Sequence, residues 1–293
     1  MNLEEEIIDG YLVPAKMKRI WAKEIGLLRQ FVEVCERHGL QYRIMGGTLL
    51  GAVRHKGYIP WDNDIDVAMF RDDFNKLLTI GEKEFAKPSF FQTVISEQGR
   101  FFSTFIKIRD SESTAAGLDE YQKGINCGIF IDVFCLDELP DGKLRRKCFV
   151  RYLNSITKMK RFCMNQPPKQ GFINEMKYRV RKAMYRLYGS PNAIELFEKY
   201  QKQAGKYWGK GGKQVSHLAF GYHDNFVWDY DDWKDSVELA FGDDKFMAPK
   251  GFDAVLKQQY GDYMRIPDDK STHDYYDFDP DIPYVVYFLK KEN

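Results

Sequence analysis

The spacing of apolar residues predicts alternating helices and strands in the first half of the chain. From Pro14 to His38 apolar residues recur at near-helical spacing, and Gly39 follows, so we expect a helix that ends there. Two β-rich runs, 90–95 and 101–108, predict strands that extend a sheet. Residues 128–136 (GIFIDVFCL) are apolar except for one aspartate, which predicts a strand buried on both faces. Together these elements predict a mixed α/β core.

The second half of the chain predicts mainly helices. Residues 143–164 carry apolar side chains at helical spacing among basic ones, which predicts a basic amphipathic helix. The segment 166–171 (QPPKQG) should break this helix, and residues 252–260 predict another one. We therefore expect a core over residues 1–140 and a mainly helical region over residues 141–293, packed on that core.

Within the core, residues 42–71 (YRIMGGTLLGAVRHKGYIPWDNDIDVAMFR) hold most of the candidate chemistry. Tyr42–Met45 predicts a short strand that ends in a turn at Gly46 and Gly47. Glycine lets a bulky anionic group approach the backbone, and Thr48 is a candidate cap for a following helix whose first amides would suit a phosphate. A glycine pair alone is more often a plain turn, so this pattern is suggestive only in its context.

Two aspartates follow in the predicted strand 61–70 (WDNDIDVAMF). Asp64 and Asp66 lie two positions apart, so their carboxylates should share one face while Ile65 and Val67 are buried on the other. A divalent cation would relieve the repulsion between the two carboxylates, and hard oxygen ligands favour Mg²⁺ or Mn²⁺. The competing interpretation is a solvated strand end with exposed acids.

A third aspartate, Asp132, lies in the middle of the buried strand 128–136. A buried carboxylate is costly unless it is hydrogen-bonded, paired with a base or bound to a metal. If this strand lies beside the one with Asp64 and Asp66, all three aspartates can share one metal site. Asp132 could then also accept a proton from an attacking hydroxyl. A satisfied structural aspartate is the alternative.

These motifs carry a resemblance to a known family. Residues 46–71 (GGTLLGAVRHKGYIPWDNDIDVAMFR) resemble the signature of the LicD family of phosphocholine transferases, which includes relatives that act with other CDP-activated alcohols. Similar family segments are FIKIRDSEST (105–114), GIFIDVF (128–134) and PKGFDAVLKQQYGDYMRIP (249–267). The resemblance implies an α/β (α+β) nucleotidyltransferase-like core with a glycine pair, a DxD strand and a third aspartate.

The resemblance also implies a reaction. It is Mg²⁺-dependent transfer of phosphocholine, or a related phospho-alcohol, from CDP-choline or another CDP-alcohol to a hydroxyl of a cell-surface glycan, a lipid-linked glycan or a teichoic-type polymer precursor. Asp64 and Asp66 would hold the metal, and Asp132 would complete the site and help to deprotonate the acceptor, with CMP leaving. Family members commonly carry aspartate at Asn63; because Asn63 has the opposite parity, we expect it to tune activity rather than abolish it.

Two other functions stay open at this point. A nucleotidyltransferase would use the same three acids but attach the nucleotide itself to a small molecule or polymer. A catalytically silent nucleotide-binding protein would bind the donor without turnover.

Basic residues near the aspartates are candidate ligands for the donor phosphates. Arg54 is preferred because a guanidinium binds phosphate in a bidentate way. Lys107 and Arg109 share strand parity and could contact phosphate from one side, although surface ion pairs would explain them equally well. His273 falls in a segment similar to the family's C-terminal pattern and is a further candidate for the donor site.

Charge is unevenly distributed along the chain. Residues 143–186 hold fourteen Lys or Arg against one acid, which fits an anionic membrane face, a polyanionic acceptor, or a helix packed on the core with a solvated basic face. Residues 224–244 hold eight acids interleaved with aromatic residues. That combination suits a quaternary ammonium such as choline, but an acidic loop anchored by core aromatics is the favoured interpretation.

Composition narrows the class of protein. Of the 293 residues, 44% are hydrophobic and 15% aromatic, which is enough for a sizeable core, and the formal net charge of +1 gives no indication of nucleic-acid binding. The five cysteines show no CxxC spacing, which argues for reduced thiols. The acidic start MNLEEEIIDG lacks a secretory signal, so we expect a cytoplasmic protein, at most peripheral to the inner face of the membrane.

Overall fold

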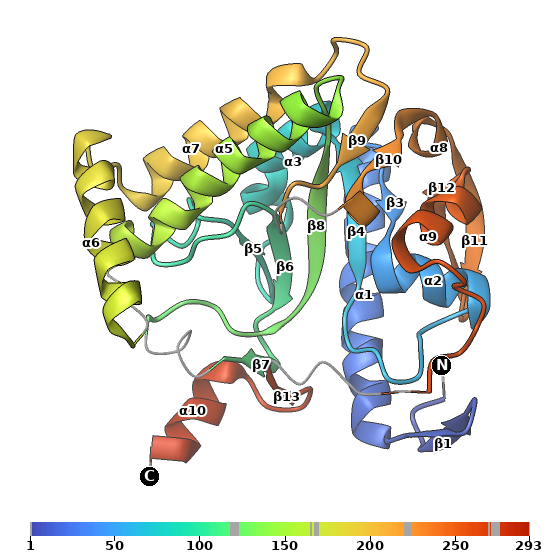
Figure 1. Cartoon of the computed structure of the whole chain (residues 1–293). Coiled ribbons are helices and arrows are strands. Elements are labelled where there is room, and N and C mark those ends of the chain that lie inside the picture. Colours follow the sequence, from blue (N-terminus) through green and yellow to red (C-terminus); the bar gives the residue numbers. More distant parts are fainter. Residues whose placement is uncertain are drawn as a thin grey trace.

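A central mixed sheet organises the molecule (Figure 1). The computed structural model describes residues 2–117, 123–164, 166, 170–219, 224–268, 270 and 276–292. In these residues the sheet has seven strands. They are β3 (Arg43–Ile44), β4 (Asp66–Phe70), β5 (Ser89–Gln92), β6 (Ile106–Asp110), β8 (Ile129–Glu138), β9 (Gln214–Ser216) and β10 (Trp228–Asp229).

The long strand β8 is the axis of this sheet. The strand order of the sheet is β10-β9-β8-β4-β3. Strand β9 pairs with the C-terminal end of β8, and β6 pairs with the N-terminal part of β8. Strand β5 pairs in turn with β6. Strand β4 runs parallel to β8, whereas β6 and β9 run antiparallel to it. Every residue of β8 is buried, as the apolar run of the sequence predicts for a strand covered on both faces. The runs that predicted strands 90–95 and 101–108 do extend the sheet, although β5 and β6 are shifted and shorter.

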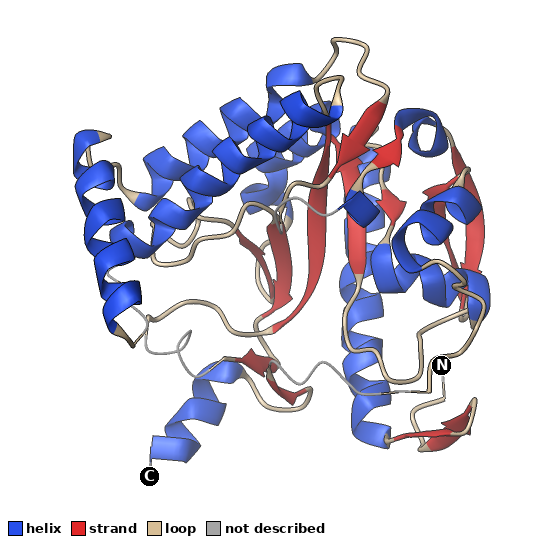
Figure 2. Cartoon of the chain, in the orientation of Figure 1, coloured by secondary structure: helices blue, strands red, loops and turns tan. Residues whose placement is uncertain are grey.

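Helices and three small two-stranded sheets surround the centre (Figure 2). The helices are α1 (Ala15–His38), α2 (Gly46–Arg54), α3 (Arg71–Glu84), α5 (Lys143–Cys163), α6 (Phe172–Leu187), α7 (Ala193–Ala204), α8 (Tyr230–Lys234), α9 (Phe252–Tyr260) and α10 (Tyr284–Glu292), with short 3₁₀ turns η1 (Gly205–Tyr207) and η2 (Asp224–Phe226). The outer strand pairs are β1 (Glu6–Ile8) with β2 (Tyr11–Val13), β7 (Thr114–Ala116) with β13 (Asp277–Asp279), and β11 (Ser236–Phe241) with β12 (Asp244–Pro249). The fold is therefore mixed α/β, as predicted.

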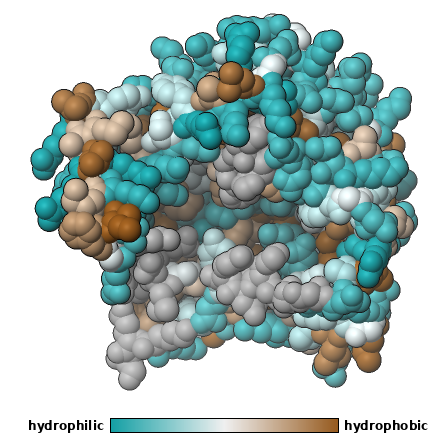
Figure 3. Space-filling model, in the orientation of Figure 1, coloured by the Kyte–Doolittle hydropathy of each residue, from teal (hydrophilic) through white to brown (hydrophobic). Residues whose placement is uncertain are grey.

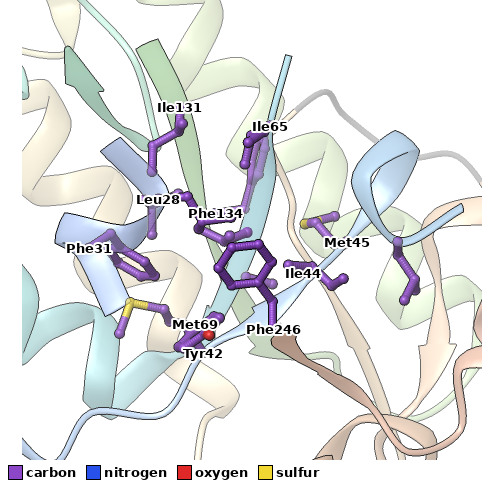
Figure 4. Close-up of a cluster of buried hydrophobic side chains, with 14 of the residues drawn as sticks. Leu28, Phe31, Tyr42, Ile44, Met45, Ile65, Met69, Ile131, Phe134 and Phe246 are labelled. Atoms are coloured by element: carbon purple, nitrogen blue, oxygen red, sulfur yellow. The ribbon is translucent and has the colours of Figure 1, made fainter. Parts of the chain in front are cut away.

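The main core lies where α1 meets β4 and β8. Leu28 and Phe31 of α1 contribute to the same buried cluster as Ile65, Met69 and Ile131 (Figure 4). The predicted helix is confirmed, and it ends at Gly39, whose φ of 62° is the left-handed conformation that favours glycine. This core fixes α1 against the two parallel strands that carry Asp66 and Asp132.

The basic helix α5 packs on the protein through its apolar residues. Leu153 and Ile156 are fully buried and belong to one cluster with Leu196 and Tyr200 of α7. The prediction of an amphipathic helix over 143–164 is confirmed, and its apolar side packs against α7 inside the protein. Two aromatic residues of 224–244 are likewise core residues: Trp228 and Trp233 are 2% and 0% exposed. The choline interpretation of 224–244 is therefore not supported by these two rings.

The C-terminal region is mainly helical, but it also completes the central sheet. Strand β9 pairs with β8, and β10 pairs with β9, so residues after position 141 share the sheet of the core. The two-part division at residue 140 stays a prediction. No helix in the described part of the chain is both long enough and apolar enough to cross a bilayer.

Candidate functional site

The glycine pair forms the first turn of α2 and lies next to the carboxylates of Asp62 and Asp66. The helix begins at Gly46, with Met45 as its N-cap, so the predicted cap at Thr48 is wrong. The hydroxyl of Thr48 instead accepts a hydrogen bond from the backbone N–H of Asp66 at 2.8 Å. Helix α2 is thereby tied to the start of β4.

The two glycines make room for acidic side chains. A Cβ on Gly46, whose φ is 57°, would lie 2.9 Å from Oδ2 of Asp66. A Cβ on Gly47 would lie 2.3 Å from Oδ2 of Asp62, a contact that real Cβ atoms do not make. The sequence predicted that an anionic group approaches this backbone, and in the structure these groups are the protein's own carboxylates.

The aspartate segment is only partly a strand. Residues 61–65 have no regular structure and β4 begins at Asp66, so the predicted strand 61–70 is too long at its start. Ile65 and Val67 are nevertheless both 0% exposed, as the alternating pattern predicts. Asp64 therefore reaches the site from the loop, one residue before the buried Ile65.

The carboxylates crowd one another. Burial, followed by the charges of Asp64, Asp132 and Asp62, raises the pKa of Asp66 well above its ordinary value. Burial and the neighbouring Asp64, which shares a side-chain hydrogen bond with it, likewise raise the pKa of Asp62. Such mutual repulsion is the electrostatic pattern of a site that attracts cations.

Asp132 faces this group from β8. In the register of the parallel strands Asp132 pairs with Asp66. The strand of Asp132 therefore does lie beside the strand of Asp66, which the sequence analysis treated as a condition for a shared site. Nζ of Lys107, on the antiparallel neighbour β6, donates hydrogen bonds to both carboxylate oxygens of Asp132, at 2.7 and 3.0 Å. Burial raises the pKa of Asp132, and the charge of Lys107 opposes that effect. The ammonium also lies 3.4 Å from the ring centre of Phe130.

A basic cavity of about 830 Å³ opens beside Asp64, Asp132 and Lys107. Side chains from α5 and α6 also line it, and many of them are basic. They include Lys158, Lys160, Arg161, Lys177 and Arg181. The part of α5 and α6 that faces the site is therefore suited to a ligand with phosphate charge.

A second cavity, of about 620 Å³, lies on the side of the glycine pair. It is lined by Gly47 and Asp62 together with aromatic residues, among them Trp61 and Tyr260. Arg54 lines it too, and its Nη1 donates to the backbone carbonyl oxygen of Tyr263 at 2.8 Å. The structure thus places Arg54 near the glycine pair, and Asp62 and Asp64 lie between the two cavities.

The predicted donor ligand Arg109 is not brought to either cavity. Arg109 is 0% exposed, and its guanidinium donates to the side chain of Gln92 and to the backbone carbonyl oxygen of Gly128 at 2.7 Å. These contacts fit a structural role in β6. His273 lies outside the described residues.

The sequence did not single out two further acidic residues at the site. Asp62 has the same parity as Asp64 and Asp66, which was a usable signal. Glu24 occupies a core position of α1, where its buried carboxylate accepts a hydrogen bond from the hydroxyl of Tyr58 at 2.9 Å. Burial raises the pKa of Glu24 well above its ordinary value, and the nearby aspartates add to the effect. A glutamate within the apolar stripe of a packing helix was the signal for it.

The acidic group does not form a complete metal cage. Among the residues that the structure describes, no three or more His, Cys, Asp or Glu side chains are arranged so that they alone could hold a metal ion. Mg²⁺, however, is commonly bound by one or two carboxylates and completes its shell with water and substrate phosphates. The repulsion around Asp66 fits such a site. The metal site formed by Asp64, Asp66 and Asp132 stays a prediction.

Comparison with known proteins identifies the domain that contains this site. A family model described as LicD/FKTN/FKRP, nucleotidyltransferase domain, matches residues 39–136, which run from the end of α1 to β8. Residues 39–136 thus match the LicD-type nucleotidyltransferase domain. The LicD-family segment contains the glycine pair and all the aspartates of the site. The resemblance inferred from the sequence is thereby confirmed.

Similarity to one LicD protein extends beyond that domain. The lipopolysaccharide cholinephosphotransferase LicD of Haemophilus influenzae is 26% identical over 277 residues, which cover 88% of this chain and 97% of the relative. The human ribitol 5-phosphate transferase FKRP is 32% identical over 96 residues, 31% of this chain and 18% of that protein. The uncharacterized protein RP689 of Rickettsia prowazekii is 43% identical over 47 residues, 16% of this chain and 18% of that protein.

Proposed function

We propose that this protein transfers a phospho-alcohol, phosphocholine or a close relative, from a CDP-linked donor to a hydroxyl of a glycan. The observation that carries the proposal is the convergence of Asp64, Asp66 and Asp132 beside a basic cavity, within a LicD-family domain. Two relatives support the reaction class, since one is named as a cholinephosphotransferase and the other as a ribitol 5-phosphate transferase.

In the proposed reaction the acceptor hydroxyl oxygen attacks the phosphorus that bears the alcohol. A new P–O bond to the glycan forms, and the bond between that phosphorus and the bridging oxygen of the diphosphate breaks. CMP leaves with the bridging oxygen, and the proton of the acceptor hydroxyl passes to a carboxylate oxygen of Asp132. The hydrogen bonds from Lys107 hold that carboxylate in place between β6 and β4.

Mg²⁺ is the metal we propose for this site, with Asp64 and Asp66 as the carboxylates that hold it and Asp132 completing the set. When bound, it would neutralise the diphosphate and the charge that develops on the leaving oxygen. The glycine pair keeps the start of α2 open for this purpose, because a side chain there would collide with the carboxylates of Asp62 and Asp66.

The basic cavity supplies the phosphate-facing side of the site in this proposal. Lys177 and Arg181 of α6 line it together with Asp64. Replacing both with glutamine should raise the KM for the phosphorylated substrate and leave kcat nearly unchanged, because they do not touch the aspartates' side of the cavity. Lys182 of the same helix does not line the cavity, so K182Q is the matched control.

Donor binding is the first test, because it needs no acceptor. Thermal unfolding of the full chain with Mg²⁺ would be followed in the presence of CDP-choline, CDP-ethanolamine, CDP-ribitol, CDP-glycerol, UDP-sugars and ATP. A donor at about 100 times its Kd should add roughly 2.7 kcal/mol to the free energy of unfolding. A metal-dependent shift with one CDP-alcohol supports the proposal. A shift with ATP or UDP-sugars alone would contradict it.

The fate of the donor then separates the phospho-alcohol transferase from a nucleotidyltransferase. CDP-choline labelled in its cytidine half and CDP-choline labelled in its choline half are incubated in parallel with a glycan acceptor. Choline label on the product and free labelled CMP are the expected result. Cytidine label on the product would instead indicate nucleotide transfer, and donor binding without either product would indicate a silent nucleotide-binding protein.

A further inference from the structure

Helix α6 has no buried residue at all, although it is sixteen residues long. Large apolar side chains nevertheless lie along it, with Phe172 81% and Leu187 89% exposed. In Figure 3 apolar side chains appear over this helix at the left edge of the face shown. The exposed apolar residues of α6 are Phe172, Ile173, Met176, Val180, Met184 and Leu187, which we call the α6 stripe.

The α6 stripe is one continuous face of the helix. At 100° per residue, its members fall within roughly a third of the circumference. Its flanks are basic: Lys177 and Arg181 follow one side, and Arg179, Lys182 and Arg186 follow the other. This arrangement of an apolar face between two rows of Lys and Arg is typical of a helix that lies in the interface of a lipid bilayer.

The fold uses a different face of α6. The rings of Tyr178 and Tyr185 lie 5.2 and 5.3 Å from the ring of Phe162 on α5, and these two tyrosines are half-buried. Lys177 and Arg181 line the basic cavity beside the aspartates. The α6 stripe therefore points away from both the protein core and the contact with α5, and no intramolecular packing of the described residues accounts for its apolar character.

We propose that α6 binds the surface of an anionic lipid bilayer, with the α6 stripe inserted at the boundary of the acyl chains and its basic flanks at the lipid phosphates. Charge complementarity selects this partner, since both flanks are basic and Glu175, the acid on this helix, is paired with Arg179 at 2.9 Å. The proposal does not depend on the reaction proposed above. It would place the mouth of the basic cavity next to the lipid surface.

Co-flotation with vesicles tests this directly, using the full chain without donor or metal. The variant I173S/V180S removes two side chains from the middle of the α6 stripe. The control I7S/L12S removes two exposed apolar side chains from the β1–β2 hairpin, where Ile7 and Leu12 are 72% and 54% exposed. All these residues are exposed, so circular dichroism and the melting temperature should stay at the wild-type values.

The wild-type protein and the control variant are expected to float with vesicles of equimolar phosphatidylcholine and phosphatidylglycerol, and less so at high salt. The stripe variant should lose about tenfold or more in partitioning, from the loss of two buried apolar side chains. Three flotation results would overturn the proposal: no flotation of the wild-type protein, equal flotation of the stripe variant, or equal flotation with phosphatidylcholine alone. Wild-type dimerisation abolished by I173S/V180S, without vesicle binding, would assign the stripe to a second copy of the chain and so overturn it too.

Discussion

Asp66 lies opposite Asp132 in the register of the parallel strands β4 and β8. Parallel neighbours point their side chains to the same face at matched positions, so the backbone pairing itself brings the two carboxylates together. Lys107 on β6 is paired with Asp132 from the other edge of β8. Three adjacent strands therefore place two acids and one base in a row across the sheet, and Asp132 and Lys107 of this row line the basic cavity.

Removing one carboxylate from this row should lower turnover without lowering the stability of the fold. Asp66→Asn keeps the shape of the side chain but removes a carboxylate that is buried among other carboxylates. We expect turnover, measured as CMP release from the donor, to fall by about a hundredfold or more, since the proposed metal ligand and its charge are lost. The melting temperature should stay the same or rise, because like-charge repulsion is relieved.

Asp72→Asn is the matched control for this prediction. Asp72 is an exposed acid in the first turn of α3, six residues further along the chain. Its replacement should leave CMP release within about twofold of the wild-type rate, because exposed substitutions away from a site have small effects. Wild-type activity in Asp66→Asn would refute the assignment of Asp66.

The glycine pair gives a second prediction, which concerns space rather than charge. In Gly47→Ala the new Cβ would collide with Oδ2 of Asp62 at 2.3 Å, so that carboxylate must move. We expect kcat/KM for the donor to fall by at least about tenfold, as a displacement of this size is costly in a preorganised site. Steady-state kinetics and a melting curve check the result.

Gly26→Ala is the comparison for Gly47→Ala. Gly26 is an exposed position of α1, and a Cβ there would meet no atom within 4 Å. Alanine is the better helix former by roughly 1 kcal/mol, so this variant should be more stable and fully active. If both alanine variants kept full activity, the glycine pair would have no part in shaping the site.

Patterns with a period were predictable from the sequence, whereas contacts between distant segments were not. The helices α1, α5 and α9 follow from apolar spacing, and β8 follows from its unbroken apolar run. Hydrophobic alternation placed Ile65 and Val67 correctly, yet it could not show that residues 61–65 are irregular, because an extended loop with one buried residue has the same pattern.

The acidic residues of the candidate site could be predicted from the sequence, whereas the roles of its basic residues could not. Aspartates two positions apart, and one inside an apolar run, are conspicuous in any sequence. Arg109 and Lys107 share strand parity, and both lie against the ring of Phe130. The guanidinium of Arg109 is nevertheless buried, where it donates a hydrogen bond to Gln92, seventeen residues away in the sequence. Only tertiary structure distinguishes a base that faces a cavity from one that satisfies buried acceptors.

A buried ion pair away from the site predicts a loss of stability. Both carboxylate oxygens of Asp137 on β8 accept hydrogen bonds from Arg71 of α3, one of them from Nε at 2.7 Å, and both side chains are almost fully buried. Arg71→Met leaves the carboxylate of Asp137 buried without its partner. We expect the free energy of unfolding to fall by about 3–5 kcal/mol in denaturant titration.

The double variant R71M/D137N is the informative control for that pair. It removes both charges, so its loss of stability should be smaller than that of Arg71→Met alone. Arg179→Met, which breaks the exposed pair with Glu175 on α6, should cost less than about 0.5 kcal/mol. Equal losses in the single and double variants would mean that packing of the Arg71 side chain, and not its charge, stabilises this region.

We predict that the second cavity recognises the alcohol end of the proposed donor. Tyr260 lines it together with Trp61, and acids that include Asp62 face the same space, so it fits a quaternary ammonium better than a sugar alcohol. If the donor is CDP-choline, Tyr260→Leu should raise its KM by about tenfold through loss of a cation–π contact, with kcat little changed. The KM for CDP-glycerol should stay within about twofold, since glycerol carries no cation.

The control is Tyr152→Leu, because Tyr152 is an exposed tyrosine of α5 that lines neither cavity. An equal rise in KM for both donors would show that Tyr260 contacts the nucleotide or the phosphates instead of the alcohol.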